Sequence, residues 1–140
     1  MAVKAIVIDD ETNCVEMMEW LIQTYCPELE IVGMYNNGEE AISGIREHNP
    51  DLVFLDIEMP GMNGFQLLEN FDKLTFDVVF TTAYNKFAIK AFKYSALNYL
   101  LKPVDPEDLQ ATVKRHLEKR TSISRDQIEM VVNSFIQQNS

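Results

Sequence analysis

The sequence predicts one α/β domain in which a parallel β-sheet carries helices on both faces. Five short apolar runs alternate with segments of helical periodicity over most of the 140 residues, and this alternation is typical of successive βα units. The runs are apolar almost throughout, as expected of strands buried on both faces. Polar or charged residues follow each run, and the chain length suits a single domain.

The first βα unit and the second strand are predicted from the start of the chain. Residues 3–8 (VKAIVI) form the first predicted strand. A one-sided apolar stripe over residues 12–25 predicts the first helix, which Pro27 ends. The second strand is predicted at residues 30–35, although Gly33 is uncommon inside a strand.

A capping pattern marks the next helix. Asn37 with Glu40 three residues later is typical of a capping box, so a helix is predicted to begin after Asn37 and to end near His48. The third strand is predicted at residues 51–55, between an Asn-Pro pair and the carboxylate of Asp56. This strand therefore carries an acid out of the apolar core.

Two helices and a strand are predicted in the next part of the chain. After the loop MPG, Asn63 or Gly64 opens a short helix that is predicted to include Phe71. The fourth strand is predicted at residues 76–81 and is followed by a second hydroxyl and a small residue. Residues 86–94 are predicted to form a helix with several aromatic side chains.

The last βα unit has a clear helix start. The fifth strand is predicted at residues 98–101 and ends before Lys102. Asp105, followed by proline and further acids, predicts the beginning of the last helix. We expect residues 1–120 to form the domain and residues 121–140, which have no strand pattern, to form a linker or helical extension.

Composition excludes several functional classes. The net charge of −10 argues against nucleic-acid binding by this segment, which needs clustered Lys and Arg. Cys14 and Cys26 are too far apart for a metal motif or a disulfide framework, and are expected to be free thiols in the reducing cytoplasm. No apolar run approaches the ~20 residues that span a bilayer, so no membrane partner is expected.

Chemically active side chains follow four of the five predicted strands. Asp9 and Asp10 follow the first strand, Asp56 the third, Thr82 the fourth and Lys102 the fifth. Parallel strands end at one edge of the sheet, so these residues are expected to converge there. Each residue alone has a structural explanation, since acids favour helix N-termini and hydroxyls or Lys-Pro pairs commonly end strands. The joint pattern of order, spacing and position is more specific.

The acidic residues predict a Mg²⁺ site and phosphoryl chemistry. Neighbouring carboxylates repel each other, and Mg²⁺ relieves the repulsion while keeping waters and phosphate oxygens as its other ligands. Asp56 can then stay ionised as a nucleophile toward a phosphoryl group, giving an aspartyl phosphate. Lys102 would neutralise charge on the transferred group, and Thr82 would donate a hydrogen bond to it.

Four motifs resemble a known family: IVIDDE at residues 6–11, DLVFLDIEMPGMNG at 51–64, TTA at 81–83 and NYLLKP at 98–103. Over residues 3–120 the chain is similar to the receiver domain of bacterial two-component response regulators. The resemblance implies a flavodoxin-like (βα)₅ doubly wound parallel sheet, phosphorylated by a sensor histidine kinase with Mg²⁺ as cofactor. It implies a signalling domain with self-phosphorylation and autodephosphorylation only, not an enzyme in the usual sense.

The resemblance also assigns roles to the acidic residues. Asp56 resembles the phosphoacceptor, and Asp9 and Asp10 resemble the metal-binding pair. Glu58, two residues beyond the acceptor, resembles the position that offers its backbone carbonyl to the metal.

The remaining site residues resemble the family's switch. Lys102 resembles the lysine that precedes a cis proline, Thr82 the switch hydroxyl and Tyr99 the switch aromatic. Phosphate on Asp56 is expected to draw Thr82 toward it and let Tyr99 turn inward. That change would reshape the face of the fourth helix, fifth strand and fifth helix, and dimerisation through this face is the expected output.

Residues 82–103 (TAYNKFAIKAFKYSALNYLLKP) are similar to the receivers of LytTR-type (LytR/AlgR) transcription regulators, in which a DNA-binding domain follows the receiver. Asn98 stands where family members usually have Asp. Because nothing basic and rich in strands follows residue 121, we expect a receiver cut in its linker. The alternative is a stand-alone receiver that signals only through protein partners.

Two other classes match less well. A phosphatase of the haloacid dehalogenase type also uses an aspartate nucleophile and Mg²⁺, but it needs Asp-x-Asp after the first strand, where this chain has Asp9-Asp10. A flavodoxin-like nucleotide or flavin binder needs a Gly- or Ser/Thr-rich phosphate loop at that position, and the acids there would repel a phosphate unless a metal intervened.

Overall fold

The computed structural model describes residues 2–84 and 98–119, and in this part of the chain it confirms the predicted α/β architecture. One sheet of five parallel strands has the order β2-β1-β3-β4-β5. The strands are β1 (Val3–Ile8), β2 (Leu29–Tyr35), β3 (Leu52–Asp56), β4 (Asp77–Thr82) and β5 (Asn98–Leu101). The helices are α1 (Thr12–Tyr25), α2 (Gly38–His48), α3 (Gly64–Leu68) and an unlabelled helix over residues 106–119.

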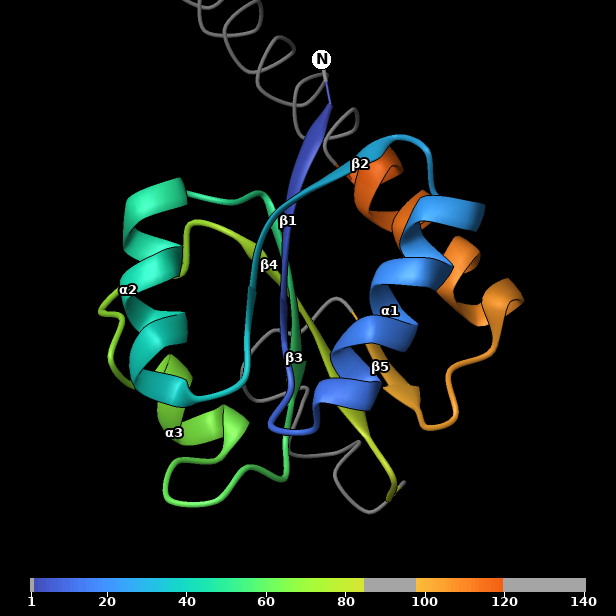
Figure 1. The fold of residues 1–140 in the computed structure, drawn as a ribbon. Helices are drawn as coiled ribbons and strands as arrows, with labels where there is room; N and C mark the ends of the chain where they lie inside the picture. The colour runs from blue at the N-terminus through green and yellow to red at the C-terminus, as the bar shows by residue number, and fades with distance from the viewer. Residues whose placement is uncertain (1, 85–97, 120–140) are drawn as a thin grey trace, which may run out of the picture.

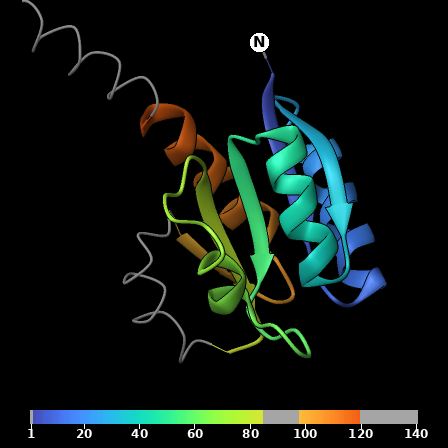
Figure 2. The same ribbon diagram turned by 90° about the vertical axis from the view of Figure 1, so that its left-hand side faces the viewer.

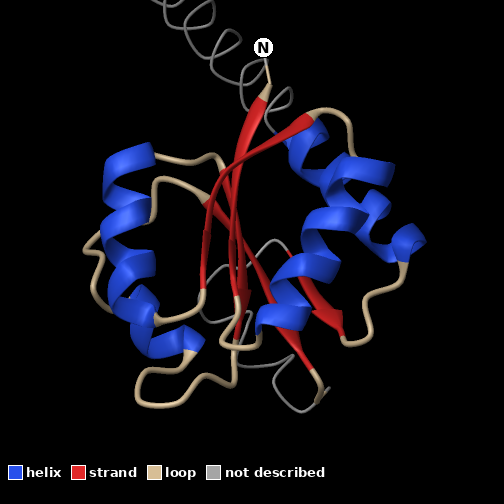
Figure 3. Cartoon of the chain, viewed as in Figure 1, coloured by secondary structure: helices blue, strands red, loops and turns tan. Residues whose placement is uncertain are grey.

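The helices cover both faces of the sheet, as a doubly wound fold requires. Figure 1 shows α2 and α3 on one side of the strands, and α1 with the helix over 106–119 on the other. Figure 2 looks onto the face that carries α2 and α3, and Figure 3 shows the strands as a single central layer. Strand β1 lies inside the sheet, between β2 and β3, because the connection from β2 to β3 crosses over it.

Two apolar cores lie on the two faces. Ile6 and Ile8 of β1 pack with α2 and α3, whereas Ala5 and Val7 pack with α1. The side chains alternate because successive residues of a strand point to opposite faces. All four are fully or almost fully buried, which explains why this strand is apolar in sequence without alternation.

Most predicted boundaries are confirmed within one residue, and the small shifts bear on the site. The strand predicted at 51–55 is β3, Leu52–Asp56, and the strand predicted at 76–81 is β4, Asp77–Thr82. Strand β3 includes Asp56 because this residue pairs with Thr81, and the Ile57 N–H donates to the Thr81 carbonyl at 3.0 Å. Strand β4 includes Thr82 because this residue pairs with Leu101 of β5. Asp56 and Thr82 are thus the last residues of strands and are held by the ladder.

The third helix is shorter than predicted, and the inclusion of Phe71 was wrong. Helix α3 ends at Leu68 because the Asn70 side chain donates to the carbonyls of Gln66 and Leu67, both at 3.2 Å. These carbonyls are therefore satisfied without another helical turn. The helix predicted at 86–94 and the segment 121–140 lie outside the described residues.

Three side chains cap helix N-termini. Asn37 accepts a hydrogen bond from the Glu40 N–H at 2.9 Å, which is one half of the predicted capping box. Asn63 and Gln66 form both halves of such a box, at 2.8 and 2.9 Å. Asp105 Oδ1 accepts from the N–H two residues later at 2.7 Å, so the predicted start of the last helix is confirmed.

Both cysteines are free, as predicted. Burial raises the pKa of the Cys26 thiol to about 11, which keeps it protonated and unreactive. Across residues 2–84 and 98–119, no helix combines the length and the apolar character needed to cross a bilayer.

Asp77 at the start of β4 joins the sheet to the last helix. Its Oδ2 lies 2.6 Å from Nδ1 of the buried His116, and its Oδ1 lies 2.8 Å from Lys119 Nζ. Burial favours the neutral acid, but the hydrogen bonds from His116 and Lys119 outweigh it and lower the pKa of Asp77. The ionised carboxylate therefore stabilises the packing of residues 106–119 on β4.

We expect Asp77→Asn to reduce the free energy of unfolding by about 1.5–3 kcal/mol near neutral pH, the range for hydrogen bonds to charged groups. Because the folded-state pKa of Asp77 is lowered, its contribution is complete above the ordinary carboxyl pKa and is lost as the pH falls through the folded value. Denaturant unfolding of wild type and variant should differ at about pH 7, and the difference should shrink as the pH falls below about 4. The matched control is Asp72→Asn, on an exposed side chain, and an equal loss in the control would contradict this role.

Candidate functional site

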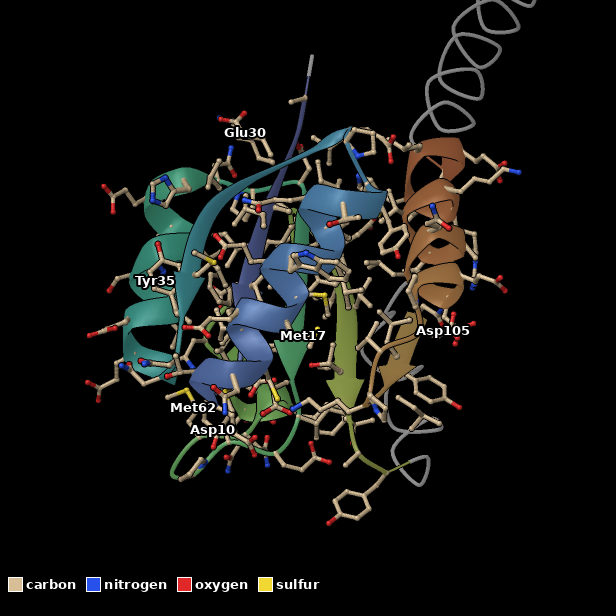
Figure 4. All side chains as sticks on the ribbon, turned by 45° about the vertical axis from the view of Figure 1, so that its right-hand side comes forward. Asp10, Met17, Glu30, Tyr35, Met62 and Asp105 are labelled. Atoms are coloured by element: carbon tan, nitrogen blue, oxygen red, sulfur yellow. The ribbon has the colours of Figure 1, made fainter. Side chains whose placement is uncertain are left out.

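The predicted site residues come from four adjacent strands. In the order β1-β3-β4-β5, β3 lies between the strand that precedes Asp9 and Asp10 and the strand that ends in Thr82. Figure 4 places Asp10 and Met62 at the end of the molecule where the strands finish, opposite Glu30 at the start of β2. The carboxyl ends of the strands thus meet in one place, as predicted.

Three carboxylates form the centre of the site. Asp9, Asp10 and Asp56 each offer an oxygen, and these oxygens all lie within 4.8 Å of one another. Asp9 and Asp56 are 4% and 1% exposed, whereas Asp10 is half-buried. The N–H of Glu11 donates to Asp9 Oδ1 at 3.0 Å, and the N–H of Glu58 to Asp56 Oδ1 at 3.3 Å. These backbone contacts fix two of the acids in place.

Among the described residues, the ammonium group of Lys102 is the only positively charged group that contacts these acids. Its Nζ lies 2.7 Å from Asp9 Oδ2 and 3.3 Å from Asp56 Oδ1. Burial acts to lower the pKa of Lys102, but the contact with Asp9 and the charge of Asp56 outweigh it and raise that pKa. The Lys102 N–H donates to the Thr82 carbonyl at 2.8 Å, and the peptide bond to Pro103 is cis, as the family resemblance implied.

One ammonium group does not balance the acids. Burial, contact with Asp10, the charge of Asp9 and contact with Glu58 together raise the pKa of Asp56 to about 8, against the opposing charge of Lys102. The raised pKa shows that Lys102 alone does not offset the burial of Asp56 and its contact with the neighbouring acids. A cluster of hard oxygen donors beside half-buried Asp10 fits Mg²⁺, which takes one or two carboxylates and keeps several waters.

The Thr82 hydroxyl at the end of β4 is fully buried and makes two hydrogen bonds. It donates a hydrogen bond to Glu58 Oε1, and it accepts one from the Tyr84 N–H at 3.0 Å. The sequence predicted a role only for the backbone carbonyl of Glu58, so the side-chain contact was missed. The contact follows from the pairing of β3 with β4, since Glu58 follows the end of one strand and Thr82 ends the other; the sequence alone carries no signal for it.

Tyr99 lies apart from the acids, in the middle of β5. It pairs with Phe80 of β4 and packs, half-buried, against the core on the face of α2 and α3. Its role as a switch stays a prediction. Asn98 beside it donates to the hydroxyl of the buried Thr112 at 2.8 Å, which ties β5 to the helix over 106–119.

Gly64, which the sequence marked only as a possible helix start, has a second role that was missed. A Cβ on Gly64 would lie 2.7 Å from the backbone oxygen of Asp56 and 3.2 Å from Cα of Ile57. The Gly64 N–H also donates to the Ile57 carbonyl at 3.0 Å. The loop after Asp56 can therefore close back on its own strand only with glycine at this position.

We expect Gly64→Ala to cost about 1–3 kcal/mol, as overpacked sites usually do, and to weaken Mg²⁺ binding by moving the backbone at Asp56. Thermal unfolding with and without Mg²⁺ measures both effects. Gly61→Ala serves as the comparison, because alanine would be strained at the φ of 78° found there, but its Cβ would meet nothing within 4 Å. Unchanged Mg²⁺ binding in Gly64→Ala would show that the close approach does not shape the site.

An apolar groove leads to the acids. It has a volume of about 270 Å³ and reaches Asp9 and Lys102. Its walls include apolar side chains of α1 and of the segment after β5: Met17, Met18, Leu21, Pro103 and Val104. Met17, on the outer side of α1 in Figure 4, is 57% exposed. The groove therefore joins an apolar surface to the charged centre.

Comparison with known proteins identifies the family. A family model described as "Response regulator receiver domain" matches residues 5–114. The chain belongs to the receiver-domain family of response regulators. The predicted resemblance is confirmed, and the protein is a receiver domain of a two-component system. Members of this family bind Mg²⁺ at an acidic pocket, and a histidine kinase is the partner that family membership implies.

Relatives and solved structures agree with this assignment. The receiver is 42% identical over 116 residues to a response regulatory protein of Vibrio cholerae, covering 82% of this chain and 48% of that protein. It is 34% identical over 138 residues to the sensory transduction protein LytT of Bacillus subtilis, covering 97% of this chain and 55% of that protein. The receiver thus spans about half the length of these curated relatives, and the LytT similarity supports the predicted LytTR type.

The fold also matches solved receivers. A response regulator receiver domain protein of Clostridium thermocellum superposes with a TM-score of 0.76 at 26% identity, over 88% of this chain and 99% of that one. The response regulatory domain of mrkE from Klebsiella pneumoniae gives 0.74 at 29% identity, over 83% and 96%. The predicted flavodoxin-like fold is therefore confirmed.

Proposed function

We propose that Asp56 accepts a phosphoryl group from a sensor histidine kinase in a Mg²⁺-dependent reaction. The observation that carries this proposal is the meeting of Asp56, two further acids and Lys102 at the ends of adjacent strands. An Asp56 oxygen attacks phosphorus, an O–P bond forms and the N–P bond to the kinase histidine breaks. The histidine nitrogen leaves with the electron pair of that bond.

The acids would hold the metal. Asp9, Asp10 and Asp56 supply carboxylate oxygens, and the Glu58 carbonyl supplies a further ligand. When bound, Mg²⁺ supplies positive charge that lets Asp56 react as the carboxylate. Lys102, already in contact with Asp9 and Asp56, balances negative charge on the transferred group.

Phosphorylation of Asp56 would change the conformation of Thr82 and Tyr99. The Thr82 hydroxyl donates to a phosphoryl oxygen, and the movement of Thr82 toward the site frees space for the Tyr99 ring. The face that includes β5 and residues 106–119 then favours a homodimer. Residues 1–120 form the receiver in this proposal, and residues 121–140 lead toward a LytTR DNA-binding domain that regulates transcription in the cytoplasm.

Intact mass spectrometry after incubation with acetyl phosphate tests the phosphoacceptor. We expect one phosphoryl group per chain with Mg²⁺, none after chelation and none in Asp56→Ala. Turnover of added phosphoesters without a stable adduct would instead indicate a phosphatase. Size-exclusion mass with and without beryllofluoride tests dimerisation, and an unchanged monomer at high concentration would contradict it.

A further inference from the structure

We infer that the Glu58 side chain is a latch on Thr82 that opposes phosphorylation of this receiver. Glu58 Oε1 accepts the hydrogen bond of the Thr82 hydroxyl, which is the group that the proposed function assigns to a phosphoryl oxygen. The inference rests on that proposed function. It adds a positioning residue that sets how readily the receiver adopts its phosphorylated state.

The hydroxyl can serve only one acceptor at a time. A threonine hydroxyl has one proton to donate. Thr82 is fully buried, and the Tyr84 N–H already fills an acceptor position of its oxygen at 3.0 Å. The Tyr84 carbonyl, at 3.3 Å, is the other acceptor near this proton in the described chain. Donation to a phosphoryl oxygen therefore requires the contact with Glu58 to break.

Charge works in the same direction. The Glu58 carboxyl group lies beside Asp56, and its side-chain contact with Asp56 is one cause of the raised pKa of Asp56. A phosphoryl group on Asp56 would bring further negative charge to the same place. Glu58 must then turn away from Thr82, and it is only half-buried, so its carboxylate has solvent to move into.

The hydrogen bond from Thr82 and the negative charge of Glu58 can be separated by two substitutions. Glu58→Ala removes both the charge and the acceptor, whereas Glu58→Gln removes the charge but keeps an oxygen that can accept from Thr82. The latch therefore predicts a graded order, with the phosphorylated state favoured most in Glu58→Ala, less in Glu58→Gln and least in wild type. A purely electrostatic effect predicts that the two variants are alike.

Binding of beryllofluoride with Mg²⁺, followed by fluorine NMR, measures the effect directly. We expect Glu58→Ala to bind about tenfold more tightly than wild type, close to the lower end of the range for a lost hydrogen bond to a charged group. Glu58→Gln should bind only about threefold more tightly, because its amide oxygen still accepts a weaker, neutral hydrogen bond from Thr82. In a Thr82→Ala background, which has no hydroxyl to release, the two substitutions should give equal gains of no more than about twofold. The net-charge control is Glu47→Gln, on the exposed side of α2.

Gains in Thr82→Ala as large as those in the Thr82 protein would overturn the latch and leave only a charge effect. A second measurement separates this result from a failure of the proposed function. In the unliganded protein, the Thr82 methyl resonance should shift in Glu58→Ala and Glu58→Gln but not in Glu47→Gln. Absence of Asp56-dependent beryllofluoride binding in wild type refutes the proposed function, and an unmoved Thr82 resonance refutes the latch.

Discussion

Replacing Asp56 by Asn is expected to raise the free energy of unfolding of the metal-free protein by an amount of the order of 2 kcal/mol near neutral pH. The wild-type site holds three carboxylates within 4.8 Å and balances them with Lys102 alone. Burial and the neighbouring acids raise the pKa of Asp56 to about 8. Ionised Asp56 therefore destabilises the metal-free fold, and Asn keeps the shape without the charge.

The pH dependence has a definite sign. A carboxyl group whose folded-state pKa is raised costs nothing below its ordinary pKa, and its cost grows as the pH rises toward the folded value of about 8. Thermal or denaturant unfolding should thus show no advantage of Asp56→Asn near pH 4, and an increasing one toward pH 8. Added Mg²⁺ should stabilise wild type more than the variant and shrink the difference.

Asp72→Asn is the control for Asp56→Asn, because this exposed carboxylate lies outside the cluster. It should leave the unfolding curve unchanged at each pH. A variant at Asp56 that unfolds more easily than wild type at every pH would show that the acids are not strained in the absence of metal.

Replacing Lys102 by Ala is expected to slow phosphorylation by acetyl phosphate by about 10²–10³, the usual cost of removing one preorganised charge-stabilising group. The same substitution should tighten Mg²⁺ binding. Lys102 Nζ lies 2.7 Å from Asp9 Oδ2 and 3.3 Å from Asp56 Oδ1, so its ammonium group competes with the metal for two of the three acids.

The opposite directions of the two effects make the Lys102 experiment specific. Rates of phosphoryl incorporation by intact mass and Mg²⁺ affinity by titration calorimetry measure them separately. Lys102→Arg keeps the charge and should retain the competition with Mg²⁺, while the exposed Lys114→Ala should change neither quantity. Parallel loss of rate and of Mg²⁺ affinity in Lys102→Ala would indicate that the site had collapsed.

Much of the site could be predicted because each group is marked locally. A buried apolar run followed by a carboxylate at Asp56, by a hydroxyl at Thr82 or by Lys102 shows where each strand ends, and parallel strands end together. The three acids and Lys102 are therefore in contact, as expected. Helix starts at Asn37 and Asp105 were predictable for the same reason, since a cap is decided by its own few residues.

The remaining features depend on which segments become neighbours. The contact of Glu58 with Thr82 arises from the pairing of β3 with β4, and the requirement for glycine at position 64 arises from the return of its loop onto Asp56. Asp77 meets His116 across 39 positions of the chain. Pair preferences of this kind leave no local pattern in a single sequence.

The sequence by itself determined where strands and helices begin, which face of each is apolar and which functional groups stand at the strand ends, because these depend on interactions between residues a few positions apart. Only the tertiary structure decided the strand order, the partner of the Thr82 hydroxyl and the requirement for glycine at position 64. The physical reason is that these features follow from register and from competition for single hydrogen bonds, which exist only after distant segments have packed together.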